Sequence, residues 1–373
     1  MFKRLLAVAA GVLLTFAGAV VAADLRADHP TTYVVQKGDT LWDIAGKFLG
    51  EPWLWPEIWQ ANPQVESPHR IYPGDVLSLV YVDGQPRIAA SGPSDGPRVG
   101  EAINTVPLSQ IEPFLKQFTI VEDVESLPYV VSLEDGRLYS SAGQLVYVRG
   151  LAGAEPGMMV DLARPVNQFG GGNRRVGPGF SALDFRGEVN HNHWGVPEEF
   201  NEAAGEILGY EMLVHASGEV TNVQGDITSI VLRDEGREIR IGDRVLMPEA
   251  QPYDLHFIPR AADPVPTHGR ILAVADGVTA GPRVVVALNV GARDGIRNGN
   301  VFSVWDENLG HEDRVADRLS AVEDTYGDLE LPDEFLGHLM VFRTFDKVSY
   351  ALVMSGIKPI SQGDVLKHPD AAQ

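Results

Sequence analysis

One seven-residue phrase recurs along the chain and limits the folds that the chain can adopt. It consists of an aliphatic residue, two variable residues, glycine, Asp or Asn, valine, and then leucine or phenylalanine. Because glycine can take a positive φ and valine favours extended backbone, each copy predicts a tight turn that leads directly into a β-strand. Copies lie at 71–77, 296–302 and 360–366, and a shifted copy lies at 241–246. The intervals are irregular, so the phrase indicates architecture and does not establish internal duplication.

Short strand-like runs separated by turn residues fill the chain after residue 107, for example at 145–148 and 227–232. Many short strands at this spacing predict small barrels or sandwiches. Prolines cluster at 259–266, so we expect a β-rich middle domain at 108–260 and a β-rich C-terminal domain at 261–368. Residues 83–107 are rich in Gly, Pro and Ser and are predicted to be a linker.

Composition excludes several classes of chemistry and partner. The chain has no cysteine, which excludes disulfides, a lipid-modified N-terminus and thiol nucleophiles. Its formal net charge is −21 over 373 residues. Nucleic acid is therefore not an expected partner, because its binding depends on Lys and Arg that neutralise phosphates. Anionic membrane surfaces are disfavoured as well, which leaves neutral glycans, basic protein surfaces or metal ions.

The N-terminus has the pattern of a secretory signal. Lys3 and Arg4 precede an uncharged apolar run at 5–21, and residues 21–23 offer small side chains to a signal peptidase. The alternative is a membrane anchor, but a run of about 17 residues is near the lower limit for spanning a bilayer. We expect a signal peptide at 1–23, export of the chain, and no integral membrane segment after cleavage.

Residues 31–82 carry the densest local signals, and they predict strand, helix, helix and strand. Thr40 and Asp43 have the spacing of a helix capping box. The apolar residues that follow recur on one helical face, and they are Leu41, Ile44, Ala45 and Phe48. The returning strand is expected at 76–80. The predicted fold class is therefore α+β, a small βααβ domain followed by mostly-β domains.

Three stretches of this segment, at 35–45, 62–63 and 71–77, resemble the LysM family in sequence, order and spacing. The resemblance implies binding of peptidoglycan or another glycan that contains N-acetylglucosamine, in a groove between the loop after the first strand and the loop before the last. The glycan-binding residues that it implies are Gly38, Asp39, Thr40, Leu41, Asn62, Pro63, Ile71, Tyr72 and Pro73. A neutral N-acetyl sugar requires backbone amides and a small apolar pocket for its methyl group.

Four of the six tryptophans fall in this short segment, and they are Trp42, Trp53, Trp55 and Trp59. They can form a platform on which sugars stack, or they can fill the core of a small domain. We favour the core, because a domain of about 50 residues without disulfides has difficulty burying enough apolar area.

Other features suggest chemistry and are discounted. His191 and His193 form a His-x-His pair, but the upstream ligands that a LysM-bearing metallopeptidase requires are lacking, so we expect no metal site. Glycines at 170–172 lack the Lys and Ser/Thr ending of a phosphate loop. Glu66 is similar in context to the acid of lytic transglycosylases, yet no helical domain follows it. The acidic segment at 306–334 lacks EF-hand spacing and is predicted to be a solvated insertion. No cofactor is expected.

Phrases at 129–131, 146–150, 205–211 and 339–345 carry a second resemblance. Following a LysM domain, they resemble the type IV pilus secretin-associated proteins, which join LysM to a region similar to the C-terminal domain of flagellar FlgT proteins. The resemblance spans most of 120–367 and implies a role at the outer-membrane secretin.

We therefore expect a non-enzymatic periplasmic protein, associated with the cell wall or the outer membrane, that anchors an envelope machine to peptidoglycan. The outer-membrane secretin is the candidate protein partner. One alternative is a metal-dependent peptidoglycan hydrolase that uses His191 and His193. Another is a general wall-binding envelope protein unrelated to pili.

Overall fold

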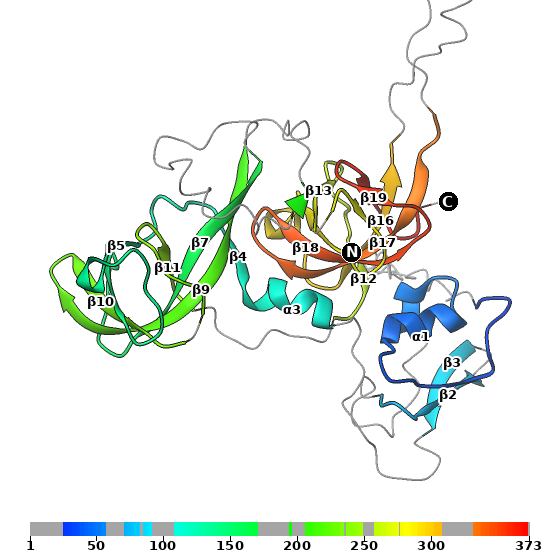
Figure 1. The fold of residues 1–373 in the computed structure, drawn as a ribbon. Helices are drawn as coiled ribbons and strands as arrows, with labels where there is room; N and C mark the ends of the chain where they lie inside the picture. The colour runs from blue at the N-terminus through cyan, green and yellow to red at the C-terminus, as the bar shows by residue number, and fades with distance from the viewer. Residues whose placement is uncertain are drawn as a thin grey trace, which may run out of the picture.

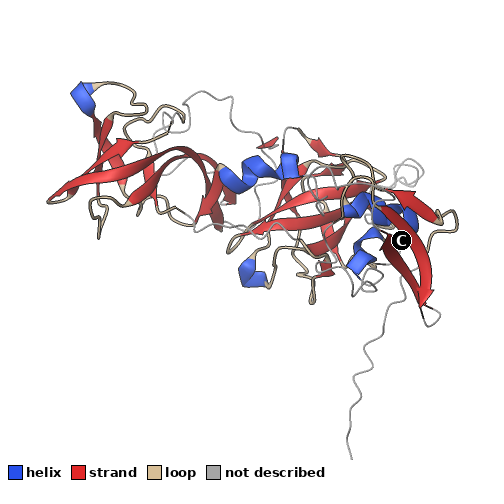
Figure 2. Cartoon of the chain, turned by 90° about the horizontal axis from the view of Figure 1, so that it is seen from below, coloured by secondary structure: helices blue, strands red, loops and turns tan. Residues whose placement is uncertain are grey.

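The computed structural model describes residues 25–56, 71–82, 85–91, 108–170, 194–195, 206–234, 236–248, 257–275, 277–307 and 331–371. Three β-sheets of three, seven and eight strands dominate this part of the chain. Figures 1 and 2 show the seven-stranded middle sheet at one end and the eight-stranded C-terminal sheet toward the other, with helix α3 (Leu108–Lys116) between them. The N-terminal part lies beside the C-terminal sheet (Figure 1). The expectation of mostly-β structure after a small N-terminal domain is confirmed.

The described residues of the N-terminal part form a three-stranded antiparallel sheet, a helix and a 3-10 turn. In chain order they are β1 (Thr32–Val34), α1 (Leu41–Phe48), η1 (Pro52–Leu54), β2 (Val76–Val82) and β3 (Gln85–Ser91). All four apolar residues predicted for one face of α1 are buried. The second helix, which the sequence predicts from Pro56 to a stop at Asn62, falls mostly on residues outside the described part of the chain.

Strand β3 corrects the predicted linker at 83–107. Residues 85–91 pair with β2 along its whole length, from Val82–Gln85 to Val76–Ser91. The small residues and Pro86 in this segment have a linker-like composition, which concealed the strand. Proline is tolerated there because β3 is an edge strand in the sheet order β1-β2-β3. Residues 92–107 lie outside the described part of the chain.

The middle sheet closes on itself. Its strands are β4 (Phe118–Val121), β5 (Tyr129–Leu133), β6 (Leu145–Arg149), β7 (Met159–Gly170), β9 (Ile207–Gln224), β10 (Ile227–Leu232) and β11 (Arg244–Leu246), with the 3-10 turn η2 (Glu134–Gly136) after β5. The pairings run β10-β6-β5-β11-β7-β9, and β9 pairs again with β10, while β4 extends from the outer side of β9. These strands therefore form a ring of antiparallel pairs around one apolar cluster.

The C-terminal sheet has the order β12-β16-β17-β18-β15-β13-β8, with β20 added to β16. These strands are β8 (Trp194–Gly195), β12 (Arg260–Ala261), β13 (Ile271–Ala275), β15 (Val285–Leu288), β16 (Asn300–Asp306), β17 (Glu334–Thr344), β18 (Ser349–Gly356) and β20 (Val365–Lys367). A separate pair is formed by β14 (Thr279–Ala280) and β19 (Ile360–Ser361), and η4 (Ala292–Asp294) follows β15.

Two strands do not follow the boundary predicted at residue 260. Strand β12 spans it and pairs in parallel with β16. Strand β8, which comes from the predicted middle domain, pairs with β13 of the C-terminal sheet, so Trp194 lies in a strand of that sheet. A strand of two residues is too short to show an alternating apolar pattern in the sequence. It is defined only by its pairing with β13, which is distant along the chain.

Both faces of the C-terminal sheet are buried, which explains its continuous apolar runs. In β15, Val286 and Leu288 belong to an apolar cluster formed by the C-terminal part alone. Val285 and Ala287 point to the opposite face of the sheet and belong to a second apolar cluster. The second cluster also contains residues of the N-terminal part and of α3 (Leu108–Lys116), among them Trp42 and Phe114. The three parts of the described chain therefore share apolar packing.

The recurring phrase forms the same type II turn at each site. The turns are Gln36–Asp39, Tyr72–Asp75, Arg240–Asp243, Arg297–Asn300 and Ser361–Asp364, of which the first was not predicted as a copy. In each, glycine at the third position has φ between 90° and 95°, and the Asp or Asn side chain accepts a hydrogen bond from the backbone N–H of the first residue. The predicted positive φ and the strand that follows are confirmed at the four predicted copies.

Candidate functional site

Two of these turns, Gln36–Asp39 and Tyr72–Asp75, lie side by side at one end of the N-terminal sheet. Val35 joins them, because its N–H donates to the carbonyl oxygen of Asp75 and its carbonyl accepts from the N–H of Gly74, each at 2.9 Å. Since Val35 directly precedes Gln36, the loop that leads into α1 begins beside the turn that leads into β2. The described segments of the predicted glycan site, 38–41 and 71–73, are therefore neighbours.

Side chains hold the first turn in shape and leave its backbone at the surface. The Asp39 carboxylate accepts from the N–H of Gln36 and from the hydroxyl of Tyr33, both at 2.8 Å. Burial, together with the Asp39 carboxylate, raises the pKa of Tyr33 to about 12, so the phenol remains a donor at neutral pH. Gly38 is exposed at the tip of the turn with φ 95°. This rigid, open backbone can approach a ligand closely.

Three of the predicted site residues have buried side chains with structural roles. Leu41 and Ile71 are 3% and 2% exposed and lie in the apolar core. Thr40 is also buried, and its hydroxyl accepts from the N–H of Asp43 at 3.1 Å and donates to the Asp43 carboxylate at 2.9 Å. The Thr40 cap of the predicted capping box is confirmed, but the Asp43 carboxylate bonds to the Thr40 hydroxyl and not to its backbone N–H. Because the three side chains are buried, a sugar can meet these residues only through their backbone.

The remaining site residues differ in how far the structure describes them. Tyr72 and Pro73 are half-buried on the second turn, where the Tyr72 N–H donates to the Asp75 carboxylate at 3.0 Å. Asn62 and Pro63 lie outside the described residues.

The tryptophans of this region are core residues. Trp42, Trp53 and Trp55 are 3%, 8% and 2% exposed. Their burial confirms the preferred interpretation over a sugar-stacking platform. Trp59 lies outside the described residues.

The two neighbouring turns and the capped helix α1 contain residues on which the sequence resemblance rests. A comparison with known families identifies the segment that they belong to. The LysM domain family matches residues 33–80. Residues 33–80 are a LysM domain. LysM domains bind peptidoglycan and related glycans and are not catalytic, which indicates a location in the cell envelope or outside the cell.

A curated protein of Bacillus subtilis is similar to the chain over a short stretch. The uncharacterized protein YqbP of Bacillus subtilis (strain 168) is 43% identical over 60 residues, which are 13% of this chain and 27% of YqbP. The chain thus matches about a quarter of that relative's length. The resemblance to pilus secretin-associated proteins over 120–367 stays a prediction.

The features that suggested catalysis lie largely outside the described residues, including His191, His193, Glu66 and the glycines that follow Gly170. Among the residues that the structure describes, no three His, Asp or Glu side chains form a group able to hold a metal ion. None of the described helices is both long enough and apolar enough to span a bilayer.

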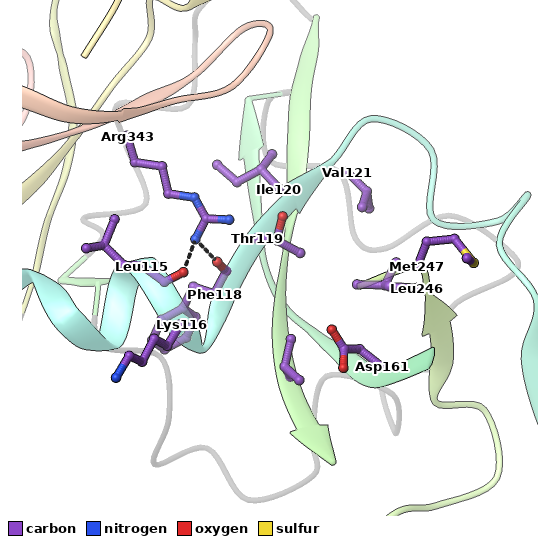
Figure 3. Close-up of a pocket in the computed structure, with 11 residues that line it drawn as sticks. Leu115, Lys116, Phe118, Thr119, Ile120, Val121, Asp161, Leu246, Met247 and Arg343 are labelled. Atoms are coloured by element: carbon purple, nitrogen blue, oxygen red, sulfur yellow. Dashed lines mark hydrogen bonds between the residues drawn. The ribbon is translucent and has the colours of Figure 1, made fainter. Parts of the chain in front are cut away.

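A cavity of about 290 Å³ lies away from the LysM domain, between α3, β4, β7 and β17 (Figure 3). Arg343 reaches it from β17, and Lys116 and Asp161 contribute from α3 and β7. Arg343 is 6% exposed, and its Nη1 donates to the carbonyl oxygens of Phe114 (2.6 Å), Leu115 (3.0 Å) and Phe118. The guanidinium caps the C-terminus of α3, which is a structural role.

One residue of the C-terminal part reaches the LysM domain in an unusual conformation. Residues Gly281–Val284 form a type II turn with a 3.3 Å hydrogen bond, and Arg283 takes the third position with φ 72°. A left-handed conformation costs a non-glycine residue roughly 1–2 kcal/mol. The Arg283 Nη2 lies 3.1 Å from Oδ2 of Asp43, but this pair is exposed, and such pairs contribute only about 0–1 kcal/mol. The ion pair alone does not offset the strain.

Proposed function

We propose that this chain is a non-catalytic peptidoglycan-binding protein of the periplasm that ties an envelope assembly to the cell wall. The observation that carries the proposal is the LysM domain at 33–80, with its two glycine turns placed side by side. The nine predicted residues, from Gly38 to Pro73, supply the groove. Export depends on the signal peptide expected at 1–23.

The arrangement of the chain supports an anchoring role. The middle sheet lies at the opposite end of the described structure from the LysM domain (Figure 1). A protein of this shape can hold the wall at one end and leave the other end for a protein partner. The resemblance over 120–367 makes the outer-membrane secretin of a type IV pilus the proposed partner. A ring of copies around such an assembly would strengthen weak single-site binding by avidity.

Retention on purified sacculi tests the wall-binding half of the proposal. The best single variant places a large side chain on the groove without removing a structural contact. Pro73→Trp meets this condition, because position two of the turn is occupied by Lys37, Ile241, Asn298 and Gln362 in the other copies. We expect the mature protein to pellet with sacculi and Pro73→Trp to be lost from the pellet. Thr40 is unsuitable for this test, since its hydroxyl caps α1.

Ile241→Trp is the matched control, because it makes the same change at the same turn position on the middle sheet, where Ile241 is 61% exposed. It should be retained like the unmodified protein. Equal retention of all three proteins, or of none, would contradict binding through this groove. Co-purification with secretins from native envelopes tests the partner, and wall binding without any secretin would favour a general wall-binding role.

A further inference from the structure

Arg283 occupies a backbone position that glycine fills in the five turns described above. In the five turns described above, the third residue is always glycine, with φ near 90°. In the turn Gly281–Val284 the same position holds an arginine at φ 72°, fixed by a 2.7 Å hydrogen bond from its N–H to the Val353 carbonyl. Glycine would adopt this backbone conformation without strain, so the geometry of the turn gives no reason for an arginine at position 283.

The side chain of Arg283 contacts the LysM domain next to one of the two loops predicted to bind glycan. Its guanidinium lies 3.1 Å from the Asp43 carboxylate, and that same carboxylate oxygen lies 2.9 Å from the Thr40 hydroxyl. Thr40 belongs to the loop 38–41 that forms one wall of the groove. A cation is thus held one side chain away from the groove, although it is 240 residues distant in sequence.

The guanidinium has capacity for a ligand. The side chain is 53% exposed, and its contact with Asp43 uses one of the five N–H donors that arginine carries. Arginine donors match the geometry of a carboxylate, with which they form charge-assisted pairs of hydrogen bonds. Because the chain has a formal charge of −21, an anionic ligand needs such a local cation to approach it.

Peptidoglycan supplies carboxylates that a simple N-acetylglucosamine polymer lacks. Alternate sugars of its strand bear a lactyl carboxyl group, which is free or continues into a stem peptide with carboxylates of its own. We propose that Arg283 is a specificity residue that recognises a carboxylate of the wall glycan while the LysM groove holds the neighbouring N-acetyl sugar. This inference rests on the proposed function and adds the class of ligand that the site prefers.

Calorimetric titration of the mature protein tests the proposal with three ligands of equal sugar length. They are a neutral N-acetylglucosamine oligomer, a peptidoglycan strand stripped of its stem peptides, and the same strand with stem peptides. We expect about tenfold tighter binding of one or both carboxylate-bearing strands than of the neutral oligomer. The strand with the larger preference identifies the lactyl or the peptide carboxylate as the source.

The decisive variant is Arg283→Gly, because it removes the guanidinium and relieves the turn. It should keep or raise the thermal midpoint, bind the neutral oligomer unchanged, and lose the tenfold preference. Asp43→Asn, which retains an acceptor for Thr40 and removes the competing carboxylate, should enlarge the preference. An unmodified protein without the preference, or a preference that survives in Arg283→Gly, would overturn the assignment. Failure of all three ligands to bind would instead sink the proposed function.

Discussion

At the scale of single residues, the side chain at the fourth position of the recurring turn always accepts a hydrogen bond from the backbone N–H of the first residue. The charge on that side chain and the groups around it differ from turn to turn. Asp243 has a counter-ion, since Arg164 pairs with both of its oxygens at 2.7 and 2.8 Å. Asn300 makes the turn hydrogen bond without a charge. Asp364 has a carboxylate neighbour instead, and burial followed by the charge of Asp306 raises the pKa of Asp364 to about 6.

Asp364→Asn is expected to stabilise the protein at neutral pH and not at acid pH. An ordinary aspartate pKa is 3.8, so the folded state binds a proton between about pH 4 and 6. The stability that this proton provides is complete below pH 4 and is lost as the pH rises through 6. Urea unfolding should therefore show Asp364→Asn more stable by on the order of 2 kcal/mol at pH 7.5, with little difference at pH 4.

The reverse change at the matched position, Asn300→Asp, should destabilise at pH 7.5, because it introduces a charge at a residue that is 4% exposed. The Asp364 assignment would be wrong if Asp364→Asn gave the same difference at both pH values.

Thr40 separates structural from ligand-binding effects in the LysM domain. Thr40→Ala should cost about 1 kcal/mol of folding free energy through loss of the helix cap, and Thr40→Ser should restore it. The measurement is urea unfolding followed by the fluorescence of the buried tryptophans. If Thr40→Ala were as stable as the unmodified protein, the cap would not contribute, and Thr40 would be free for a role in binding.

At the scale of secondary structure elements, the sequence predicted what depends on local rules. The turns, the cap and apolar face of α1, and the strands after each turn follow from residue preferences over a few positions. Strand β3 was missed because its pairing with β2 prevails over a composition typical of linkers. Strand β8 was missed because only its partner β13 defines it.

Helix α3 depends on a contact that no local pattern reveals. Arg343 hydrogen-bonds to two carbonyls in the last turn of α3 and to the carbonyl of Phe118 just beyond it, across more than 220 residues of sequence. Arg343→Leu should lower the free energy of unfolding by about 3 kcal/mol, because the buried carbonyls lose the hydrogen bonds that Arg343 donates. Hydrogen exchange should accelerate in 108–116.

Arg233→Leu is the control for this change. It breaks a 2.6 Å ion pair with Glu219, but the Arg233 side chain is 52% exposed. Its effect on stability should stay within about 0.5 kcal/mol. Comparable losses in the two variants would contradict the proposed role of Arg343 as a buried helix cap.

At the scale of the whole molecule, the LysM domain packs against the C-terminal sheet. The apolar cluster that spans them is flanked by the Arg283–Asp43 pair and by His338, whose Nε2 lies 3.8 Å from a carboxylate oxygen of Glu51. Burial lowers the pKa of His338, which favours the neutral ring, and its Nε2–H donates to the Pro369 carbonyl at 3.2 Å. These long-range contacts, including the ion pair that holds Arg283 beside Asp43, were beyond prediction from one sequence.

This packing predicts that the LysM domain tumbles with the C-terminal sheet. NMR relaxation of backbone amides in α1 and in β17 should give one rotational correlation time. A shorter time for α1 would mean that the domain is tethered flexibly, and Arg283 would then not stay beside Asp43.

The most direct test of glycan binding is an NMR titration of the mature protein with a soluble N-acetylglucosamine oligomer. The largest amide shifts are expected at Gly38, Asp39, Tyr72 and Gly74, the backbone of the two adjoining turns. An unchanged spectrum, or shifts confined to the cavity between α3 and β17, would contradict recognition of the wall through the LysM groove.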